Sequence, residues 1–400
     1  MSVTVPRGFE AAGIACGIKA SGALDLALVA TADRQPVSAA GVFTTNLVRA
    51  APVQVSKEHL GNGRAVAVVL NSGNANAATG EQGRRDARRM CEFTANGLGC
   101  DPEDVLVCST GLIGVPLPME PVEAGIAKLV ETLSPGGDLA ADAILTTDTR
   151  AKEFTDRLEL GDGKIAHFGG MAKGAAMLSP AMATMLAVIT TDLAIEPSAL
   201  RRMLADGVEE SFHRLSVDGC TSTNDTVIAL ASGAAGNEPI TEGSAAYTQA
   251  ARAVRRGCHI LTAEMAFDAE GRTKVADVVV KGAKTQQDAL LAARAVANSQ
   301  LVQCSLNGGD PYWGRVLSEL GASGASFDPE KVDIAYASVA RDVVVCRDGV
   351  AADHDAQTLA DVMASEHIMI TCYLHEGTGE ADITTTDLSH AYIDENRRTS

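Results

Sequence analysis

Short runs rich in valine and isoleucine, separated by stretches with helical spacing, constrain the fold of this chain more than any other feature. The runs have the length and the β-branched content of strands rather than helices. They are Arg64–Leu70, Thr226–Leu230, Val275–Val280, Asp342–Cys346 and Ile368–Leu374. Helical patterns lie between them, at Gly83–Asn96, from Pro197 to Phe212, and at Gln286–Asn298. This mixture predicts an α/β or α+β fold.

Charge and cysteine content narrow the class of protein. The 400 residues carry 51 acidic and 33 basic side chains, a net charge of −18, which argues against a nucleic-acid or anionic-membrane surface. The nine cysteines include no C-x-x-C pair, so reduced thiols are expected rather than a zinc ribbon or disulfides. Without a leader-like start or an apolar run of about 18 residues, a soluble cytoplasmic protein is expected.

Three polar, glycine-rich segments are expected to be loops rather than strands or helices. They are Asn71–Gly80 (NSGNANAATG), Cys108–Gly114 (CSTGLIG) and Val217–Asp225 (VDGCTSTND). Glycine lets backbone N–H groups approach a ligand closely, although any one of these segments is also explained as an ordinary turn. Three in one chain suggest that some converge on a pocket.

The stretch His167–Asp192 (HFGGMAKGAAMLSPAMATMLAVITTD) contains a threonine at the head of an expected buried strand. If the chain is cut before Thr184, the released α-amine, with an ordinary pKa of about 8, accepts the proton of the threonine hydroxyl. Attack of that hydroxyl on the Ala183 carbonyl explains the cut itself. From the residues alone, however, a core strand that happens to contain a threonine explains the segment better.

A resemblance to a known family favours self-cleavage before Thr184 over a core strand that happens to contain a threonine. The segment KGAAMLSPAMATMLAVITTD resembles the autoprocessing signature of the ornithine acetyltransferase family, also called glutamate N-acetyltransferases. Further blocks resemble the family in the same order along the chain. They are Leu70–Gly80, Cys108–Gly114, Ile144–Arg150, Val217–Thr226, Asn298–Val316 and Thr385–Asn396.

The resemblance implies a layered sheet-and-helix fold like that of N-terminal-nucleophile hydrolases, cut into an α chain (residues 1–183) and a β chain (residues 184–400). The two chains would stay together, commonly as an α2β2 heterotetramer. It implies a ping-pong reaction that moves acetyl from N-acetylornithine to glutamate in arginine biosynthesis. Some members also accept acetyl-CoA. No metal, tightly bound cofactor, nucleic acid or membrane partner is expected.

The resemblance also implies roles for individual residues. Thr184 is the nucleophile, Ala183–Thr184 the cleaved bond, and Thr110 with Gly111 the oxyanion hole. Substrate contacts carry over to Thr146, Lys173, Thr184, Glu270, Asn396 and Ser400. Lys173 suits a substrate carboxylate, and Glu270 suits the side-chain ammonium of ornithine.

This sequence departs from the family pattern near several of these positions. Ala269 and Arg272 replace a glycine and an alanine around Glu270, and Tyr312 replaces an asparagine. Ser400 follows Asn396 by four positions, whereas the family's last contacting residue follows by five. Two alternatives therefore remain: an N-terminal-threonine amidohydrolase or peptidase, and a paralogue that is structural, regulatory or active in a secondary-metabolite pathway.

Overall fold

A computed structural model describes residues 2–137, 139–161, 163–177 and 185–397 of the chain. They form two compact units. Unit 1 comprises Met1–His213 and Cys220–Met265, and unit 2 comprises Arg214–Gly219 and Ala266–Ser400.

Unit 1 contains two sheets. The four-stranded sheet has the order β1 (Phe9–Ile14), β2 (Leu26–Thr31), β5 (Ala67–Asn74), β6 (Val105–Leu112). The six-stranded sheet has the order β4 (Arg64–Ala65), β3 (Val37–Phe43), β11 (Thr226–Ala231), β9 (Leu186–Thr191), β8 (Lys164–Lys173), β7 (Lys152–Gly161).

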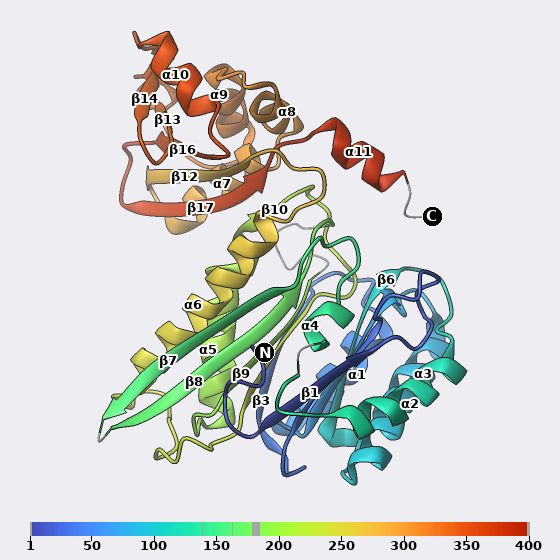
Figure 1. Ribbon diagram of the computed structural model, residues 1–400. Helices are drawn as coiled ribbons and strands as arrows, with labels where there is room; N and C mark the ends of the chain where they lie inside the picture. Colours follow the sequence, from blue (N-terminus) through green and yellow to red (C-terminus); the bar gives the residue numbers. More distant parts are fainter. Residues whose placement is uncertain (1, 138, 162, 178–184, 398–400) are drawn as a thin grey trace. The chain divides into compact units, whose positions relative to one another are not determined.

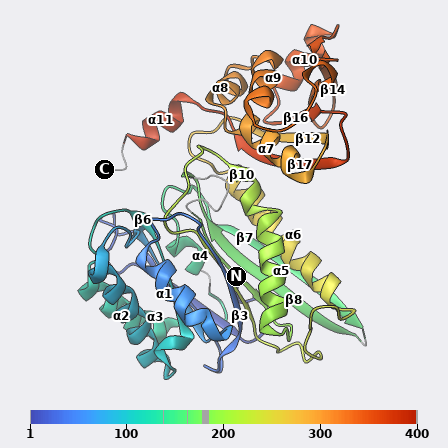
Figure 2. The same cartoon turned by 180° about the vertical axis from the view of Figure 1, so that it is seen from behind.

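Side-chain alternation builds the layers of unit 1. Ala27 and Val29 of β2 join a core that also holds Val188 of β9 and Ile228 of β11, so the two sheets pack face to face. The opposite face of the four-stranded sheet packs against α1 (Ala51–His59), α2 (Gly80–Leu98) and α3 (Met119–Thr132). Helices α5 (Pro197–Glu209) and α6 (Tyr247–Ala266) lie along the outer face of the six-stranded sheet, giving the order helix, sheet, sheet, helix (Figures 1 and 2).

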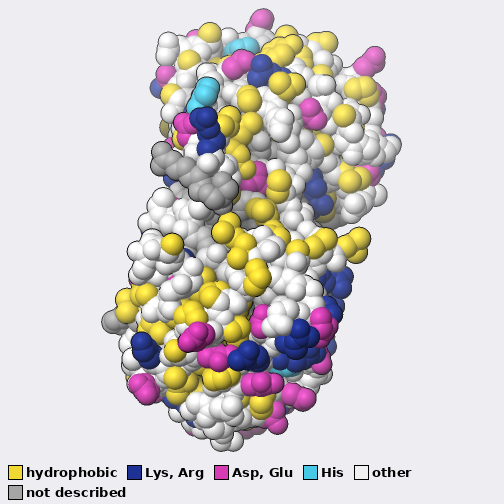
Figure 3. Space-filling model, turned by 90° about the vertical axis from the view of Figure 1, so that its right-hand side faces the viewer, with side chains coloured by type: hydrophobic (Ala, Val, Ile, Leu, Met, Phe, Trp, Pro, Cys, Tyr) yellow, Lys and Arg dark blue, Asp and Glu magenta, His cyan; other side chains and the backbone are white. Residues whose placement is uncertain are grey.

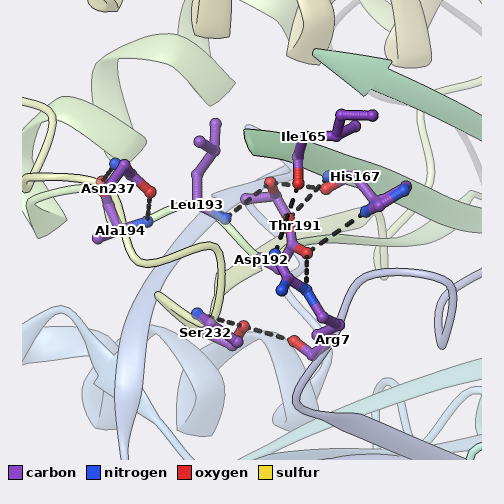
Figure 4. Close-up of polar contacts among 10 residues, drawn as sticks. Arg7, Ile165, His167, Thr191, Asp192, Leu193, Ala194, Ser232 and Asn237 are labelled. Atoms are coloured by element: carbon purple, nitrogen blue, oxygen red, sulfur yellow. Dashed lines mark hydrogen bonds and ion pairs between the residues drawn. The ribbon is translucent and has the colours of Figure 1, made fainter. Parts of the chain in front are cut away.

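Strand β9 lies inside the six-stranded sheet, antiparallel to β8 and parallel to β11. All six of its residues are buried, which confirms the buried strand predicted after Thr184. Just past its C-terminal end, the buried carboxylate of Asp192 accepts from the His167 amide at 2.7 Å and from Arg7 Nε at 2.9 Å (Figure 4). Ser232 Oγ donates to the Arg7 carbonyl. This cluster therefore fastens the N-terminal segment to the sheet.

Unit 2 is one mixed sheet with helices. The strand order is β10 (Leu215–Ser216), β17 (Gly379–Thr386), β12 (Val275–Ala283), β16 (His367–Tyr373), β13 (Asp333–Ala337), β14 (Asp342–Arg347), β15 (Val350–Ala351). The helices are α7 (Gln286–Ala297), α8 (Gln300–Gly308), α9 (Trp313–Ala322), α10 (Ala356–Met363) and α11 (His390–Asn396). Alanines of α7, among them Ala289 and Ala293, let this helix pack closely on β12 and β17.

The mixed fold class predicted from the sequence is confirmed, and each predicted strand and helix is present. The run Arg64–Leu70 nevertheless divides into β4 and β5, which belong to different sheets. The prediction of loops at Asn71–Gly80 and Cys108–Gly114 is wrong at their N-terminal ends, because β5 continues to Asn74 and β6 to Leu112. Their polar residues fit inside strands because they pair with each other: Ser109 Oγ donates to Asn71 Oδ1 at 2.5 Å.

Candidate active site

Ala183 and Thr184 lie outside the described residues, but the residue bonded to Thr184 is held firmly. The amide of Met185 donates to Asp225 Oδ1 at 2.9 Å, and its carbonyl accepts from the Thr226 amide at 3.1 Å. Met185 and Leu186 are both buried. The chain directly after the predicted cleavage site is therefore fixed at the head of β9, beside β11.

Asp225 is fully buried, and its two carboxyl oxygens differ. Oδ1 accepts from Met185, whereas Oδ2 has no hydrogen-bond partner within the described part of the chain. Burial raises the pKa of Asp225 well above its ordinary value; the Met185 amide, the Ser222 hydroxyl and the Lys173 ammonium oppose this shift without cancelling it. Burial therefore makes ionisation of Asp225 less favourable than that of an ordinary aspartate.

The predicted oxyanion residues lie at the end of β6. Thr110 is buried, and its Oγ1 has no hydrogen-bond partner among the residues described. Gly111 has φ of +132°, and a Cβ there would lie 2.3 Å from the Gly73 carbonyl carbon. Only glycine fits this backbone. The end of β6 therefore offers a hydroxyl without a described partner beside a backbone conformation that only glycine adopts.

Asn224 joins the three polar segments that the sequence singled out. Its Nδ2 donates to the Ala75 carbonyl at 2.6 Å and to the Ser109 carbonyl at 2.8 Å. Ser109 precedes Thr110, and Asp225 follows Asn224 and binds Met185. The three segments therefore contact one another, and through these contacts the end of β6 that carries Thr110 is tied to the head of β9.

Lys173 and Thr146 are brought together by Asp148. The Lys173 Nζ lies 3.5 Å from Asp148 Oδ2, and this same oxygen accepts from the Thr146 amide at 3.0 Å. Asp148 Oδ1 accepts from the buried Lys152 ammonium and from the Gly174 amide. Burial alone would raise the pKa of Asp148, but Lys173 and Lys152 outweigh it and hold that pKa below its ordinary value. With two buried ammonium groups and one carboxylate, the site suits an anionic ligand.

In unit 2, Glu270 and Asn396 are in contact. Asn396 Nδ2 donates to Glu270 Oε2 at 2.8 Å, and Tyr392 of the same helix, α11, donates through its hydroxyl to Asp218. A Cβ at Gly271 would lie 2.1 Å from the Tyr392 amide nitrogen, so glycine is required for α11 to approach. Glu270 is itself buried. Ser400 lies outside the described residues.

The departure at Arg272 has a structural explanation. Its guanidinium donates to the Phe267 carbonyl and to Glu366, and it lies 5.2 Å above the Phe267 ring. Arg272 therefore fixes the loop that carries Glu270. Tyr312, the other departure, stacks with the Arg315 guanidinium at 5.8 Å and is 57% exposed.

Possible metal ligands, membrane-spanning helices and cysteines were also compared in the described ranges. Those ranges contain no group of three His, Cys, Asp or Glu side chains arranged to hold a metal, and no helix in them has the length and apolarity to cross a membrane. All nine cysteines are present as thiols. Acidic and basic side chains are interspersed on the face drawn in Figure 3.

Comparison with known proteins identifies the family. The model of the ArgJ family matches residues 10–399. The chain belongs to the ArgJ family. The resemblance recognised in the sequence is thereby confirmed.

The relatives of this ArgJ-family chain match it almost end to end. The arginine biosynthesis bifunctional protein ArgJ of Symbiobacterium thermophilum is 48% identical over 394 residues, covering 98% of this chain and 96% of the relative. The protein of the same name from Mycobacterium tuberculosis is 46% identical over 402 residues, covering 98% and 95%.

Solved structures of the family are also similar in sequence. The ornithine acetyltransferase of Mycobacterium tuberculosis, solved with ornithine, is 45% identical over 45% of this chain and 94% of that chain, with a TM-score of 0.40. The ArgJ protein of Bacillus halodurans is 32% identical over 52% and 96%, with a TM-score of 0.49.

Asp148 and Asp225 were not assigned roles from the sequence. Each stands in a block that resembles the family, but an aspartate in a polar segment most often caps a turn. The missing signal was burial. Asp225 directly precedes the strand-like run Thr226–Leu230, and this is the sequence feature that places it at a strand head.

Proposed function

We propose that this chain cuts itself between Ala183 and Thr184 and then carries acetyl on Thr184 from N-acetylornithine to glutamate. Acetyl transfer in arginine biosynthesis follows from membership of the ArgJ family. The assignment of Thr184 rests on one observation above the others. The Met185 amide, bonded to Thr184, is held by Asp225, and the neighbouring Asn224 binds the Ser109 carbonyl next to Thr110.

The proposed chemistry uses one hydroxyl twice. In the precursor, the Thr184 hydroxyl attacks the Ala183 carbonyl, and water hydrolyses the resulting ester to leave a free α-amine on Thr184. In the enzyme, that amine takes the hydroxyl proton while Thr184 attacks the acetyl carbonyl of N-acetylornithine. The C–N bond breaks, ornithine leaves with the proton, and the glutamate amine then attacks the acetyl ester. Thr110 and Gly111 are the proposed donors to the oxyanion.

The proposal assigns the substrate's charged groups to charged side chains. Lys173, held with Thr146 by Asp148, receives the amino-acid carboxylate. In unit 2, Glu270 receives the ornithine side-chain ammonium, with Asn396 orienting its carboxylate. Ser400 is kept as a proposed contact on the resemblance alone.

The proposed α chain (1–183) and β chain (184–400) would remain joined by the six-stranded sheet. Strands β9 and β11 of the β chain lie between β3 and β8 of the α chain, hydrogen-bonded on both sides. Separating the chains would break two strand ladders in a buried sheet. Assembly into an α2β2 heterotetramer and a cytoplasmic location complete the proposal.

A second activity is motivated by the word bifunctional in the names of the relatives. We propose that acetyl-CoA also acetylates Thr184, so that the same ester yields N-acetylglutamate. Glutamate-dependent release of the CoA thiol by the purified enzyme would test this step.

The main proposal is tested by steady-state transfer from N-acetylornithine to glutamate, with hydrolysis measured in parallel. Wild-type enzyme is expected to form N-acetylglutamate well above the rate of acetate release, and Thr184→Ala is expected to form none. Acetate as the main product would instead support an amidohydrolase. Transfer of other acyl groups in preference to acetyl would support the secondary-metabolite alternative.

A further inference from the structure

The partly buried ammonium of Lys19 ties together two segments of unit 1. Its Nζ donates to the Leu24 carbonyl at 2.6 Å and to the Leu145 carbonyl at 2.7 Å. Leu24 lies just before β2, whereas Leu145 directly precedes Thr146, one of the proposed substrate contacts. One cation therefore holds two carbonyl oxygens that are far apart in the sequence.

The peptide group between Leu145 and Thr146 is held at both of its polar ends. Its carbonyl accepts from Lys19, and its N–H donates to Asp148 Oδ2 at 3.0 Å. The same Asp148 oxygen lies 3.5 Å from the Lys173 ammonium. Lys19 and Asp148 together therefore fix the orientation of this peptide group, and with it the position of Thr146 beside Lys173.

The backbone of Lys19 is itself held by a buried carboxylate. Asp25 is fully buried, and its carboxylate accepts from the backbone amides of the four successive residues 16–19 at distances from 2.7 to 3.1 Å. Successive N–H groups that converge on one anion fix the local backbone conformation. The Lys19 side chain therefore starts from a rigid support.

Glycine at position 73 makes room for the Lys19 side chain. Gly73 lies in β5 with φ of +96°, and a Cβ there would lie 2.9 Å from Lys19 Cγ. Gly73 is also the residue whose carbonyl carbon a Cβ on Gly111 would meet. The stem of Lys19 therefore packs against the strand end that adjoins the proposed oxyanion residue Gly111.

The charges that act on Lys19 are those of the proposed substrate site. Burial lowers the pKa of Lys19, and the Lys173 ammonium adds to this shift, whereas Asp25 and Asp148 oppose it. A third ammonium, besides those of Lys152 and Lys173, thus lies within electrostatic reach of Asp148.

We propose that Lys19 is a positioning residue of the substrate site, which holds the Leu145–Thr146 peptide group so that Thr146 lies beside Lys173 and contacts the amino-acid carboxylate. This inference rests on the proposed function and adds to it a residue from the N-terminal part of the chain. Lys19 does not itself touch the substrate. Without its ammonium the Leu145 carbonyl loses its donor, whereas the contact between Lys173 and Asp148 remains.

The test is a double-mutant cycle of Lys19→Met and Thr146→Ala, measured as kcat and KM for N-acetylornithine. Methionine keeps the apolar stem beside Gly73 and removes both donated hydrogen bonds. Each single variant is expected to raise KM about tenfold with little change in kcat, since a contact made equally in the ground and transition states is lost. Because Lys19 acts through Thr146, the double variant is expected to have about the same KM as Thr146→Ala alone.

Lys164→Met is the matched control. The Lys164 Nζ also donates to a backbone carbonyl, that of Gly236 at 2.9 Å, but Lys164 begins β8 whereas Lys173 ends it. This variant is expected to keep the wild-type KM. A Lys19→Met or Thr146→Ala enzyme with the wild-type KM would overturn the inference. So would a double variant in which the two increases in KM multiply, as independent effects do.

Ornithine binding, measured by calorimetry on the full chain, repeats the cycle without turnover. Lys19→Met is expected to raise the Kd for ornithine about tenfold, and the double variant is expected to match Thr146→Ala. If Lys19→Met does not fold, Lys19→Gln takes its place in both cycles, because its shorter side chain keeps an N–H donor. A wild type that binds ornithine but transfers no acetyl would contradict the proposed function, while the calorimetric cycle still decides the role of Lys19. A wild type that binds no ornithine would overturn both.

Discussion

Asp148 and Asp225 are two buried aspartates of unit 1 with opposite surroundings. Asp148 accepts from two amides and lies against Lys152 and Lys173, and its pKa is held below the ordinary value. Asp225 accepts from one amide, has an oxygen without a described partner, and its pKa is raised. Pairing completes the first site, whereas the second keeps a buried oxygen without a hydrogen-bond partner in the described part of the chain. Burial alone therefore does not determine the direction of a carboxylate's pKa shift. The number and charge of the groups that contact it decide that direction.

Removing the charge of the paired aspartate should have the largest effect. Asp148→Ala leaves two buried ammonium groups uncompensated, so we expect a loss of about 3–5 kcal/mol in the free energy of unfolding and no measurable transfer. Asp206→Asn, which breaks the exposed pair with Arg202, is the control and should cost at most about 1 kcal/mol. Urea unfolding measures the free energy of unfolding of both variants. Equal losses for Asp148→Ala and Asp206→Asn would show that the buried pairing of Asp148 contributes no more than an exposed ion pair.

The oxyanion assignment predicts a large effect on rate without a charge change. Thr110→Ala should lower kcat by about 10²–10³, because one donor to the oxyanion is lost, while Thr110→Ser should recover most of it. Gly111 and Gly114 both have positive φ, but only at Gly111 would a Cβ clash with the backbone of Gly73. Gly114→Ala is therefore the control for Gly111→Ala. A Thr110→Ala enzyme with normal kcat would remove Thr110 from the site.

The carboxylate of unit 2 should act on binding rather than on the chemical step. Glu270→Gln removes the charge opposite the ornithine ammonium, so KM for N-acetylornithine should rise about 10- to 100-fold. Glu366→Gln, which weakens only the ion pair with Arg272, is the matched control and should change KM by less than about threefold. Initial rates at varied N-acetylornithine measure both; equal effects would mean that Glu270 acts by holding the loop.

The smallest predicted effect is a loss of folding stability at acid pH, where Asp148 becomes protonated. Because the folded pKa of Asp148 is lowered, its stabilisation is complete above the ordinary aspartate value of about 4 and is lost as pH falls below it. Melting temperatures of Thr184→Ala should therefore fall as the pH drops below about 4, and a flat acid side would contradict the pairing of Asp148.

The sequence predicted most of the architecture, because short β-branched runs and helical spacing are local signals. It also predicted that Asn71–Gly80, Cys108–Gly114 and Val217–Asp225 converge, since each carries glycine and small polar side chains. It missed that the first two continue β5 and β6, because polar residues are rare in buried strands unless they pair as Asn71 and Ser109 do. The roles of Asp148 and Asp225 depend on contacts between residues far apart in the chain, which spacing does not encode.

The central claim is that Thr184 becomes the first residue of the β chain by self-cleavage and then carries the acetyl group. The most direct measurement is the intact mass of the denatured protein, with and without N-acetylornithine, for wild type and Thr184→Ala. The account predicts two wild-type fragments divided between Ala183 and Thr184, with about one acetyl mass added to the second, and a single unmodified chain for the variant. A wild-type protein that stays at 41.3 kDa without an adduct would contradict it.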